Sequence, residues 1–332
     1  MTNFTFKISD SPDQTKLQQL VHSITEAVNT GNLKVGDSLP SINQLSSETG
    51  FSRDTIFKAY NILKQRNVIE STPQKGYYVA TESFKVFMLL DDFSAFKEQL
   101  YQSFRQNLPD TYSVDLLFHH YNTDVFKQLI QNSLGRYSMY VVMNIDNKIL
   151  DPILDKIDAN KLLILDMGKP ENGKINYLLQ DFSSSVKNCL KEGLIQLKKY
   201  NELILVYEKN STPHPVESVK AVQSFCKRNK ITFRKIAQLK SSDIKKGCAY
   251  FVIRDADLVE VVKTCRTKQL ELGRDVGVLS YNDTPMKQIV GGGITVISID
   301  FELMGKRTAE FVKNRQKIGE ILTTSLILRD SL

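Results

Sequence analysis

The segment 53–66 carries apolar side chains at the spacing of an α-helix, and it constrains the fold of the N-terminal region more than any other feature. The apolar positions follow an i, i+3, i+4, i+7 pattern, which predicts one buried helix face: Ile56, Ala59, Tyr60 and Leu63. Ser52 stands just before them, where a hydroxyl caps the first free backbone N–H groups. Gly50 permits the left-handed conformation of a tight turn. Residues 41–49, which follow Pro40, therefore predict a second, shorter helix.

Two further elements complete this N-terminal unit. Residues 68–71 and 76–80 predict the strands of a short hairpin. An earlier amphipathic helix that ends near residues 29–31 is predicted by apolar residues at helical spacing, namely Leu17, Leu20, Val21, Ile24 and Val28. Helix, sharp turn, helix and hairpin together have the layout of a winged helix-turn-helix, which places its second helix in the DNA major groove.

The same stretch resembles the GntR family of winged-helix regulators. The matching positions are Leu39, Pro40, Ser41, Leu45, Ser52, Arg53, Thr55, Ile56, Ala59, Tyr60, Leu63, Ile69, Gly76 and Val79. Three residues depart from the usual pattern: Asn43 and Phe57 stand where many relatives have Arg, and Gln74 replaces a wing glycine. The departures leave the operator sequence open, but not the type of module.

This resemblance implies DNA contacts from the starts of two helices and from the wing. The implied residues are Ser41, Ser52, Arg53, Thr55, Lys58, Lys75 and Gly76. Arg53 is expected to contact a base, because a guanidinium can donate to O6 and N7 of guanine. Ser41, Thr55 and Lys58 are expected at phosphates. Charge gives no separate support, because residues 1–83 hold eight Lys/Arg and eight Asp/Glu, and the net charge of +7 lies wholly in the remainder.

From residue 84 onward the sequence alternates apolar strands with amphipathic helices. The predicted strands are 85–90, 114–119, 139–143, 162–166, 202–206, 249–253 and 276–280. The predicted helices are 95–108, 123–134, 148–157, 182–198, 215–229 and 256–269. Strands that are apolar along their length predict an α/β fold with parallel sheets and helices on both faces. Two consecutive halves predict two lobes with a cleft between them.

The last 60 or so residues resemble the corresponding segment of LacI-type regulators. The matching positions are Asp275, Val276, Val278, Tyr281, Asp283, Ile294, Thr295, Met304, Gly305 and Ala309. The tail from Leu326 to Ser331 resembles that family's closing strand, and Arg254-Asp255-Ala256 stands where the family has Asn-Asp-Ala. Residues 84–332 are therefore similar to the periplasmic-binding-protein-like (type I) effector domains of LacI-type repressors. Combined with a GntR-type module, this resembles the sugar-responsive arabinose or fucose regulators.

The resemblances imply a domain plan. A DNA-binding domain, a linker and an effector domain are expected at 1–80, 81–84 and 85–332. The chain should cross between the lobes near residues 180, 298 and 324. One lobe would then combine about 85–180 with 299–323, and the other about 181–298 with 324–332.

Candidate effector-binding residues follow from the strand ends, because open α/β sheets bind ligands at the carboxyl ends of their strands. They are Asp92, Phe96, Asp166, Asp181, Arg254, Asp255, Asn282 and Asp283. Carboxylates, an amide and a guanidinium suit the hydroxyls of a monosaccharide, and an aromatic ring covers its apolar face. Arg254 and Asn282 depart from the family, which has Asn and Asp there.

Arg254 leaves several alternatives open. It could pair with Asp255 or Asp283, or bind a phosphorylated or otherwise anionic metabolite. A cleft that has lost its ligand and answers to a protein partner is a further alternative. His119, His120 and Tyr121 also stand at a strand end, where a solvated or packed role is expected rather than ligation.

Other classes of protein are disfavoured by what the sequence lacks. The cysteines at 189, 226, 248 and 265 form no CxxC pair and have no His at metal spacing, so reduced thiols and no metal site are expected. No Ser-His-Asp arrangement is visible, nor a phosphate cup for the pyridoxal-phosphate domain of some GntR-type chains. Neither an enzyme nor a cofactor is therefore predicted. With no secretory signal and no membrane-spanning run, a cytoplasmic location is expected rather than that of an exported sugar-binding protein.

These inferences combine into one functional expectation. The sequence predicts a ligand-responsive transcriptional repressor that binds a palindromic operator in double-stranded DNA as a homodimer. A small molecule in the interlobe cleft, a monosaccharide, is the expected effector.

Overall fold

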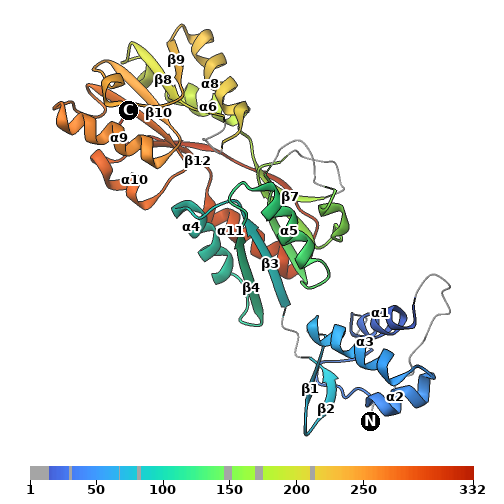
Figure 1. Cartoon of the computed structure of the whole chain (residues 1–332). Helices are drawn as coiled ribbons and strands as arrows, with labels where there is room; N and C mark the ends of the chain where they lie inside the picture. Colours follow the sequence, from blue (N-terminus) through green and yellow to red (C-terminus); the bar gives the residue numbers. More distant parts are fainter. Residues whose placement is uncertain are drawn as a thin grey trace. The chain divides into compact units, whose positions relative to one another are not determined.

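The computed structural model describes residues 15–29, 32–66, 68–80, 84–145, 152–168, 175–209 and 214–332. Within these ranges the strands form one two-stranded and two six-stranded sheets (Figure 1). The predicted fold class, a winged helix-turn-helix followed by two α/β lobes, is confirmed.

The N-terminal unit has the predicted order of elements. These are α1 (Lys16–Asn29), α2 (Ile42–Thr49), α3 (Arg53–Gln65), β1 (Ile69–Thr72) and β2 (Gly76–Val79), with β1 and β2 antiparallel. The apolar positions of the three helices form one core, in which the following side chains are fully buried: Leu20, Ile24, Leu45, Ile56, Ala59, Tyr60 and Leu63. Gly50 has a φ of 72° and its N–H binds Ser46 O, so α2 ends sharply and α3 can turn back against it.

One of the six-stranded sheets collects the strands that follow this unit. It contains β3 (Phe84–Leu90), β4 (Tyr112–Phe118), β5 (Met139–Met143), β6 (Leu162–Asp166), β7 (Asn176–Gln180) and β13 (Gly319–Leu322), in the order β13-β7-β6-β5-β3-β4. Its helices include α4 (Ala95–Gln106), α5 (Thr123–Ser133) and α11 (Phe301–Asn314). The prediction of a helix at 148–157 is wrong for the residues that the structure describes, because 154–156 form only a single 3₁₀ turn. Residues 146–151 lie outside the described part.

The other six-stranded sheet has the order β14-β12-β11-β10-β8-β9. Its strands are β8 (Glu202–Val206), β9 (Thr232–Ile236), β10 (Cys248–Val252), β11 (Val276–Tyr281), β12 (Thr295–Ser298) and β14 (Ser325–Ile327). All neighbours are parallel except β14, which runs antiparallel to β12. Its helices are α6 (Ser184–Glu192), α7 (Leu194–Leu197), α8 (Val216–Asn229), α9 (Asp255–Thr267) and α10 (Pro285–Ile289), so the single helix predicted at 182–198 is divided at Gly193.

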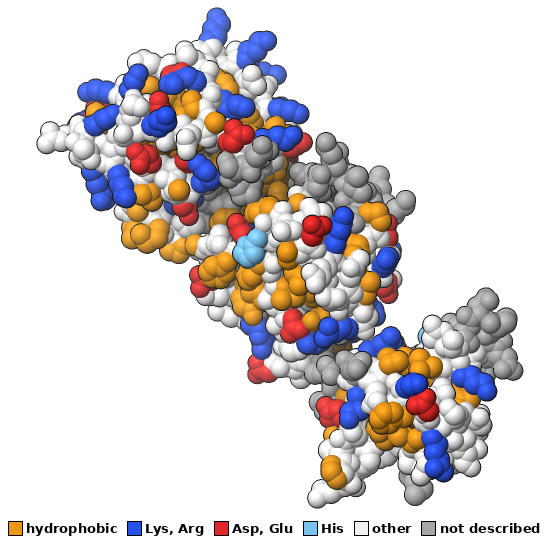
Figure 2. Space-filling view, in the orientation of Figure 1, with side chains coloured by type: hydrophobic (Ala, Val, Ile, Leu, Met, Phe, Trp, Pro, Cys, Tyr) orange, Lys and Arg blue, Asp and Glu red, His pale blue; other side chains and the backbone are white. Residues whose placement is uncertain are grey.

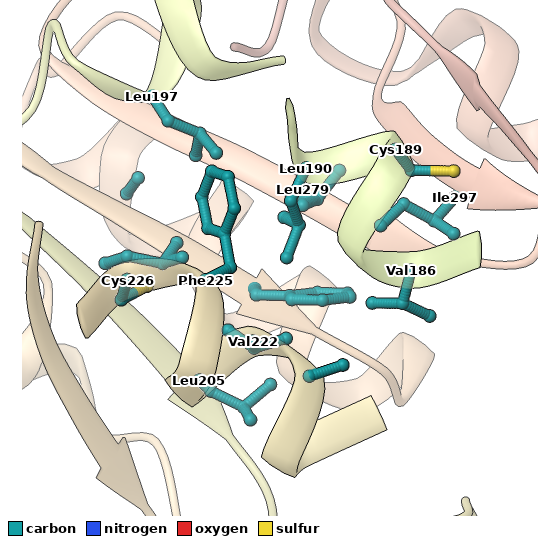
Figure 3. Packing of buried hydrophobic residues seen from close by; sticks show 14 of the residues in the cluster. Val186, Cys189, Leu190, Leu197, Leu205, Val222, Phe225, Cys226, Leu279 and Ile297 are labelled. Carbon is teal, nitrogen blue, oxygen red and sulfur yellow. The ribbon is translucent and has the colours of Figure 1, made fainter. Parts of the chain in front are cut away.

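Both faces of this sheet are covered by helices. Figure 3 shows one face, where Val186 and Leu190 of α6 and Phe225 of α8 pack over Leu205 and Leu279 of the strands. The opposite face packs on α9, through Leu258, Val261, Val262 and Cys265. Because the central strands β8, β10 and β11 are buried on both sides, the sequence has runs of apolar residues there rather than alternation.

The chain passes between the two larger sheets three times, after β7, after β12 and between β13 and β14. After β12 it enters α11, which runs alongside α4 (Figure 1). Gly305 makes this close approach possible, because a Cβ there would collide with the Leu100 carbonyl oxygen and lie 2.8 Å from Phe104 N. None of the described helices is long and apolar enough to cross a bilayer.

Candidate functional site

The starts of α2 and α3 are both capped by serine. Ser41 Oγ accepts a hydrogen bond from Gln44 N–H at 3.2 Å, and Ser52 Oγ accepts one from Thr55 N–H at 3.1 Å. The Ser52 and Thr55 hydroxyls also share a 2.8 Å hydrogen bond. These predicted contact residues therefore fix the helix starts.

The outer face of α3 presents cations to solvent. Arg53 is exposed, and within the described part of the chain its side chain has no hydrogen-bond or ion-pair partner. Lys58 Nζ lies 2.7 Å from Asp54, with both side chains more than half exposed, a pairing that contributes little to stability. Tyr60 OH, on the inner face, donates to Pro40 O at 2.8 Å and ties α3 to the start of α2. The fold thus holds α3 rigidly while its outer face stays available.

The wing carries a further cation, Lys75, at its tip. Lys75 Nζ lies 4.4 Å from the centroid of the Tyr78 ring, so a cation–π contact orients it at the hairpin tip. Tyr78 OH in turn donates to Glu70 across the hairpin at 2.9 Å. Gly76 follows with a φ of 71°, which favours glycine. All seven residues predicted to bind DNA lie on the helix starts, the outer face of α3 or the wing.

A second group of polar residues gathers at the carboxyl ends of strands in the first lobe, which is the lobe built on β3–β7 and β13; the second lobe is built on β8–β12 and β14. Lys97 of α4 is 3% exposed and forms ion pairs with both Asp91 and Asp92, which follow β3. Asp91 also accepts a 2.6 Å hydrogen bond from Tyr121 OH. One buried ammonium group is therefore shared by two carboxylates and balances the charge of only one of them.

Asp166, at the end of β6, adds a third carboxylate to this polar cluster. Burial, reinforced by the nearby Asp91 charge, raises the pKa of Asp166 to about 6, although Lys97 opposes the shift. The Gln180 amide donates to Asp166, while Gln180 Oε1 is buried and has no partner among the described residues. The cluster is rich in hydrogen-bond acceptors and has a single, shared cation.

Aromatic side chains gather at the strand ends of the second lobe. The ring centroids of His214 and Tyr281 are 4.3 Å apart, and Phe182 lies 5.4 Å from His214 and 6.1 Å from Tyr281. Burial lowers the pKa of His214 to about 3, so the ring is neutral, and its Nε2 shares a 2.6 Å hydrogen bond with Ser218 Oγ. Tyr281 OH is buried without a partner among the described residues. Burial, together with the Asp166 charge, raises its pKa well above the usual value.

Several residues predicted to bind an effector are already committed to contacts within the protein. The Asp181 carboxylate accepts from three backbone N–H groups, those of residues 183, 184 and 185, at 2.8–3.0 Å. Arg254 donates twice to Asp257, at 2.8 and 2.9 Å, so the pairing suggested with Asp255 or Asp283 is wrong. Asp283 accepts from Arg329 at 2.9 and 2.6 Å.

The remaining predicted residues fall in different places. Asp92 and Asp166 belong to the polar cluster, whereas Phe96 packs on Phe301, with centroids 4.7 Å apart. Asp255 is largely exposed and lies 3.2 Å from Lys287 Nζ. Asn282 follows Tyr281 with a φ of 59°, and its Oδ1 is buried without a partner among the described residues.

The sequence missed four members of the polar cluster: Asp91, Lys97, Tyr121 and Gln180. The acidic pair at 91–92 directly after an apolar strand was a usable signal, but the role of Lys97 depends on how α4 returns over β3. His119 is packed, as expected: it is fully buried, with Nε2 3.1 Å from Met143 O and Nδ1 accepting Tyr121 N–H.

A separate cavity of about 500 Å³ lies where the chain crosses between the lobes after β12 and β13. Its wall includes Asp283, Asp300, Phe301 and Ile321. Of the eight predicted effector residues, Asp283 alone lines it.

Comparisons with known proteins identify the two parts separately. Residues 16–79 match the model for bacterial regulatory proteins of the gntR family, and residues 194–332 match the periplasmic binding protein-like domain. The regulator YdcR of Escherichia coli K12 is 37% identical over 71 residues, which are 21% of this chain and 15% of YdcR. The mannosyl-D-glycerate system repressor MngR of the same organism is 33% identical over 113 residues, 33% of this chain and 44% of MngR. The chain thus covers less than half of the length of each of these relatives.

Solved structures resemble the C-terminal part. The trehalose repressor of Escherichia coli aligns with a TM-score of 0.61 at 12% identity, covering 74% of this chain and all of that one. A dimeric Lac repressor aligns with a TM-score of 0.60 at 16% identity, over 75% and 98% of the two chains. At such identities the likeness establishes the fold. Residues 16–79 are therefore a winged helix-turn-helix domain of the gntR family of bacterial regulatory proteins, joined in one chain to a periplasmic binding protein-like domain with the fold of the Lac and trehalose repressors.

Proposed function

We propose that the chain is a transcriptional repressor that binds a palindromic operator as a homodimer and is released from it by an uncharged monosaccharide. The observation that carries the DNA part is Arg53, an exposed guanidinium with no hydrogen-bond or ion-pair partner among the described residues, on a helix whose inner face is buried. A rigid helix with a free Arg at its start can enter the major groove and donate to guanine. MngR and YtrA of Bacillus subtilis, which share this domain, are both named repressors.

A homodimer is supported by apolar surface on the second lobe. Met286 and Ile289 of α10 are 62% and 70% exposed, and Val259 of α9 is 48% exposed. The Lys287–Asp255 ion pair joins α10 to the start of α9, and Figure 2 shows hydrophobic side chains gathered around α10. Exposed apolar patches of this kind mark protein interfaces. A two-fold dimer would place its half-sites about one helical turn, ~34 Å, apart or a multiple of that.

The polar cluster favours an uncharged effector over an anionic one. Its single cation, Lys97, is already shared by Asp91 and Asp92, and Asp166 adds further acceptor oxygens. A phosphate or carboxylate would meet negative charge there, whereas sugar hydroxyls can donate to these oxygens and to Gln180 Oε1. The half-buried rings of Phe182 and His214, backed by the buried Tyr281, offer an apolar surface for the face of a sugar ring. A structural relative from Lactobacillus casei was solved with bound glucose.

Control by the effector requires two states with different affinities for it. A ligand that moves the population from 1:99 to 99:1 must favour one state by about 5.5 kcal/mol. We infer that closure of the lobes around the sugar changes the spacing of the two DNA-binding domains in the dimer.

Two measurements on the full chain test this function. A library of random double-stranded DNA is selected on the purified protein, which should enrich a palindromic sequence. A thermal-shift panel of monosaccharides and their phosphates should then raise the melting temperature with one free sugar, because selective binding to the folded state stabilises it. That sugar should also weaken operator binding. Stabilisation by phosphorylated sugars alone would contradict the uncharged effector, and a protein that enriches no sequence would contradict the repressor.

A further inference from the structure

Phe57 is the one large apolar residue that α3 leaves substantially open to solvent among its described side chains, with 49% of its surface exposed. The apolar residues on the inner face of the helix are fully buried: Ile56, Ala59, Tyr60 and Leu63. Phe57 has no ring contact with another aromatic residue in the part of the chain that the structure describes. The core of the winged domain is thus complete without it.

The position of Phe57 on the helix places it beside Arg53. Residues four apart lie one above the other on a helix surface, so Arg53, Phe57 and Asn61 form one stripe on the outer face of α3. Lys58 and Asp54 form the adjacent stripe and are joined by an ion pair. The exposed Phe57 ring thus shares its stripe with Arg53, the residue proposed to contact a base in the major groove.

We infer that Phe57 contacts the C5-methyl group of a thymine in the operator and so sets specificity at that base pair. This inference rests on the proposed DNA-binding function. In the major groove, thymine is the base that presents a methyl group, and an apolar side chain is its matching contact. Four helix residues span ~6 Å, and successive base pairs are ~3.4 Å apart. The thymine should therefore lie about two base pairs from the guanine that Arg53 contacts.

The test uses the full chain and the operator recovered by selection. Each thymine is replaced in turn by deoxyuridine, which removes only the methyl group, and the dissociation constant is measured by fluorescence anisotropy. Burying one methyl group corresponds to about a fourfold change in affinity. We expect one thymine per half-site to show that loss, ~15-fold when both are replaced, and no comparable effect at other thymines.

Two variants assign the effect to the ring. Phe57→Ala should bind the unmodified operator more weakly and lose its sensitivity to deoxyuridine at that position, whereas Phe57→Leu should retain part of it. Val35→Ala is the matched control, because Val35 is 50% exposed on the same domain but lies outside the helix face. Its dissociation constants should equal those of the parent protein.

The outcomes distinguish a failure of the proposed repressor function from a failure of the contact between Phe57 and thymine. A parent protein that enriches no operator overturns the proposed function, and this inference with it. If the parent binds its operator but no thymine is sensitive, or if Phe57→Ala keeps the full sensitivity, the methyl contact alone is overturned.

Discussion

Arg329 and Asp283 are joined by two hydrogen bonds, of 2.9 and 2.6 Å, that fasten the C-terminal tail to the loop after β11. Both side chains are less than one-fifth exposed, at 17% and 19%. Arg329 also donates to Ile294 O at 2.8 Å. Asp283 had been predicted from the sequence as an effector ligand, but its oxygens are occupied within the fold.

Asp283→Ala is therefore expected to reduce stability. Loss of the carboxylate leaves a half-buried guanidinium without its partner, which should lower the free energy of unfolding by about 2 kcal/mol. Urea denaturation of Asp283→Ala, Arg329→Ala and the double variant gives the coupling energy. The Arg307–Glu310 pair is a matched control, because it is more exposed and should show little coupling. Additive losses at Asp283 and Arg329 would contradict a structural role for the pair.

Asp166→Asn is expected to stabilise the protein at neutral pH. Between pH 3.8 and about 6 the folded Asp166 holds a proton that the unfolded chain has released, so stability falls as the pH rises through this window. Asparagine carries no charge, so the variant avoids the cost of ionising a buried carboxyl. Its free energy of unfolding should exceed that of the parent by on the order of 3 kcal/mol at pH 7 and by little at pH 4. Its side chain can still accept from Gln180, and it tolerates the φ of 66° at this position.

The measurement is the difference in unfolding free energy between variant and parent from about pH 3 to pH 7. Asp181→Asn is the opposite control. Burial opposes ionisation of Asp181, but three backbone N–H groups outweigh it and lower the pKa of its carboxyl. The parent's advantage over Asp181→Asn should be full at pH 7 and shrink as the pH falls below 3.8. A difference for Asp166→Asn that does not vary with pH would refute the shifted pKa.

Gly305→Ala should force α4 and α11 apart. The added Cβ would collide with the Leu100 carbonyl oxygen and approach Phe104 N, and neither backbone atom can yield without moving the helix. Overpacking of this kind costs about 1–3 kcal/mol. Gly193→Ala is the control: Gly193 has a φ of −84°, and its added Cβ would meet a mobile Leu326 methyl at 3.1 Å. Equal effects of the two substitutions on thermal unfolding would argue against the close helix contact.

Arg53→Ala should impair operator binding without affecting the effector domain. A lost base contact weakens binding by about 1–3 kcal/mol per half-site, measured by anisotropy on the selected operator. The thermal shift with the effector sugar should be unchanged. Arg228→Ala removes one exposed positive charge from α8 and should leave operator affinity intact. If both variants weakened binding equally, the effect of Arg53 would be one of net charge.

The salt dependence of operator binding gives an independent check. If the Lys58 and Lys75 ammonium groups neutralise phosphates, binding releases counterions from the DNA. For a protein that makes six to ten phosphate contacts, raising the salt from 50 to 200 mM lowers the affinity by about 10³–10⁵, and the loss is smaller with fewer contacts. Lys75→Ala removes one such contact from each half-site and should flatten the slope by about two units of log K per log salt. An affinity that hardly changes with salt would refute the phosphate contacts.

The sequence by itself determined the elements whose signals are local. The buried face of α3 follows from residues three and four apart, and the turn at Gly50 follows from one glycine. Strands buried on both faces, such as β6 and β11, are recognisable as apolar runs. The sequence analysis missed β7, β9, β12 and β13 because none of them has such a long apolar run. Two of them, β9 and β13, are edge strands, and pairing with neighbours defines all four.

Only the tertiary structure decided which polar groups remain free to bind a ligand. Asp283 is satisfied by Arg329, 46 residues away, and Asp91 receives Tyr121 OH from 30 residues away. Two carboxylates with a similar local sequence signal, both close to the end of a strand, thus have different roles. Asp166 joins a cluster with spare acceptors, and Asp283 holds the C-terminal tail. A hydrogen bond is made with whichever donor the fold brings within about 3 Å, and that donor has no fixed spacing in the sequence.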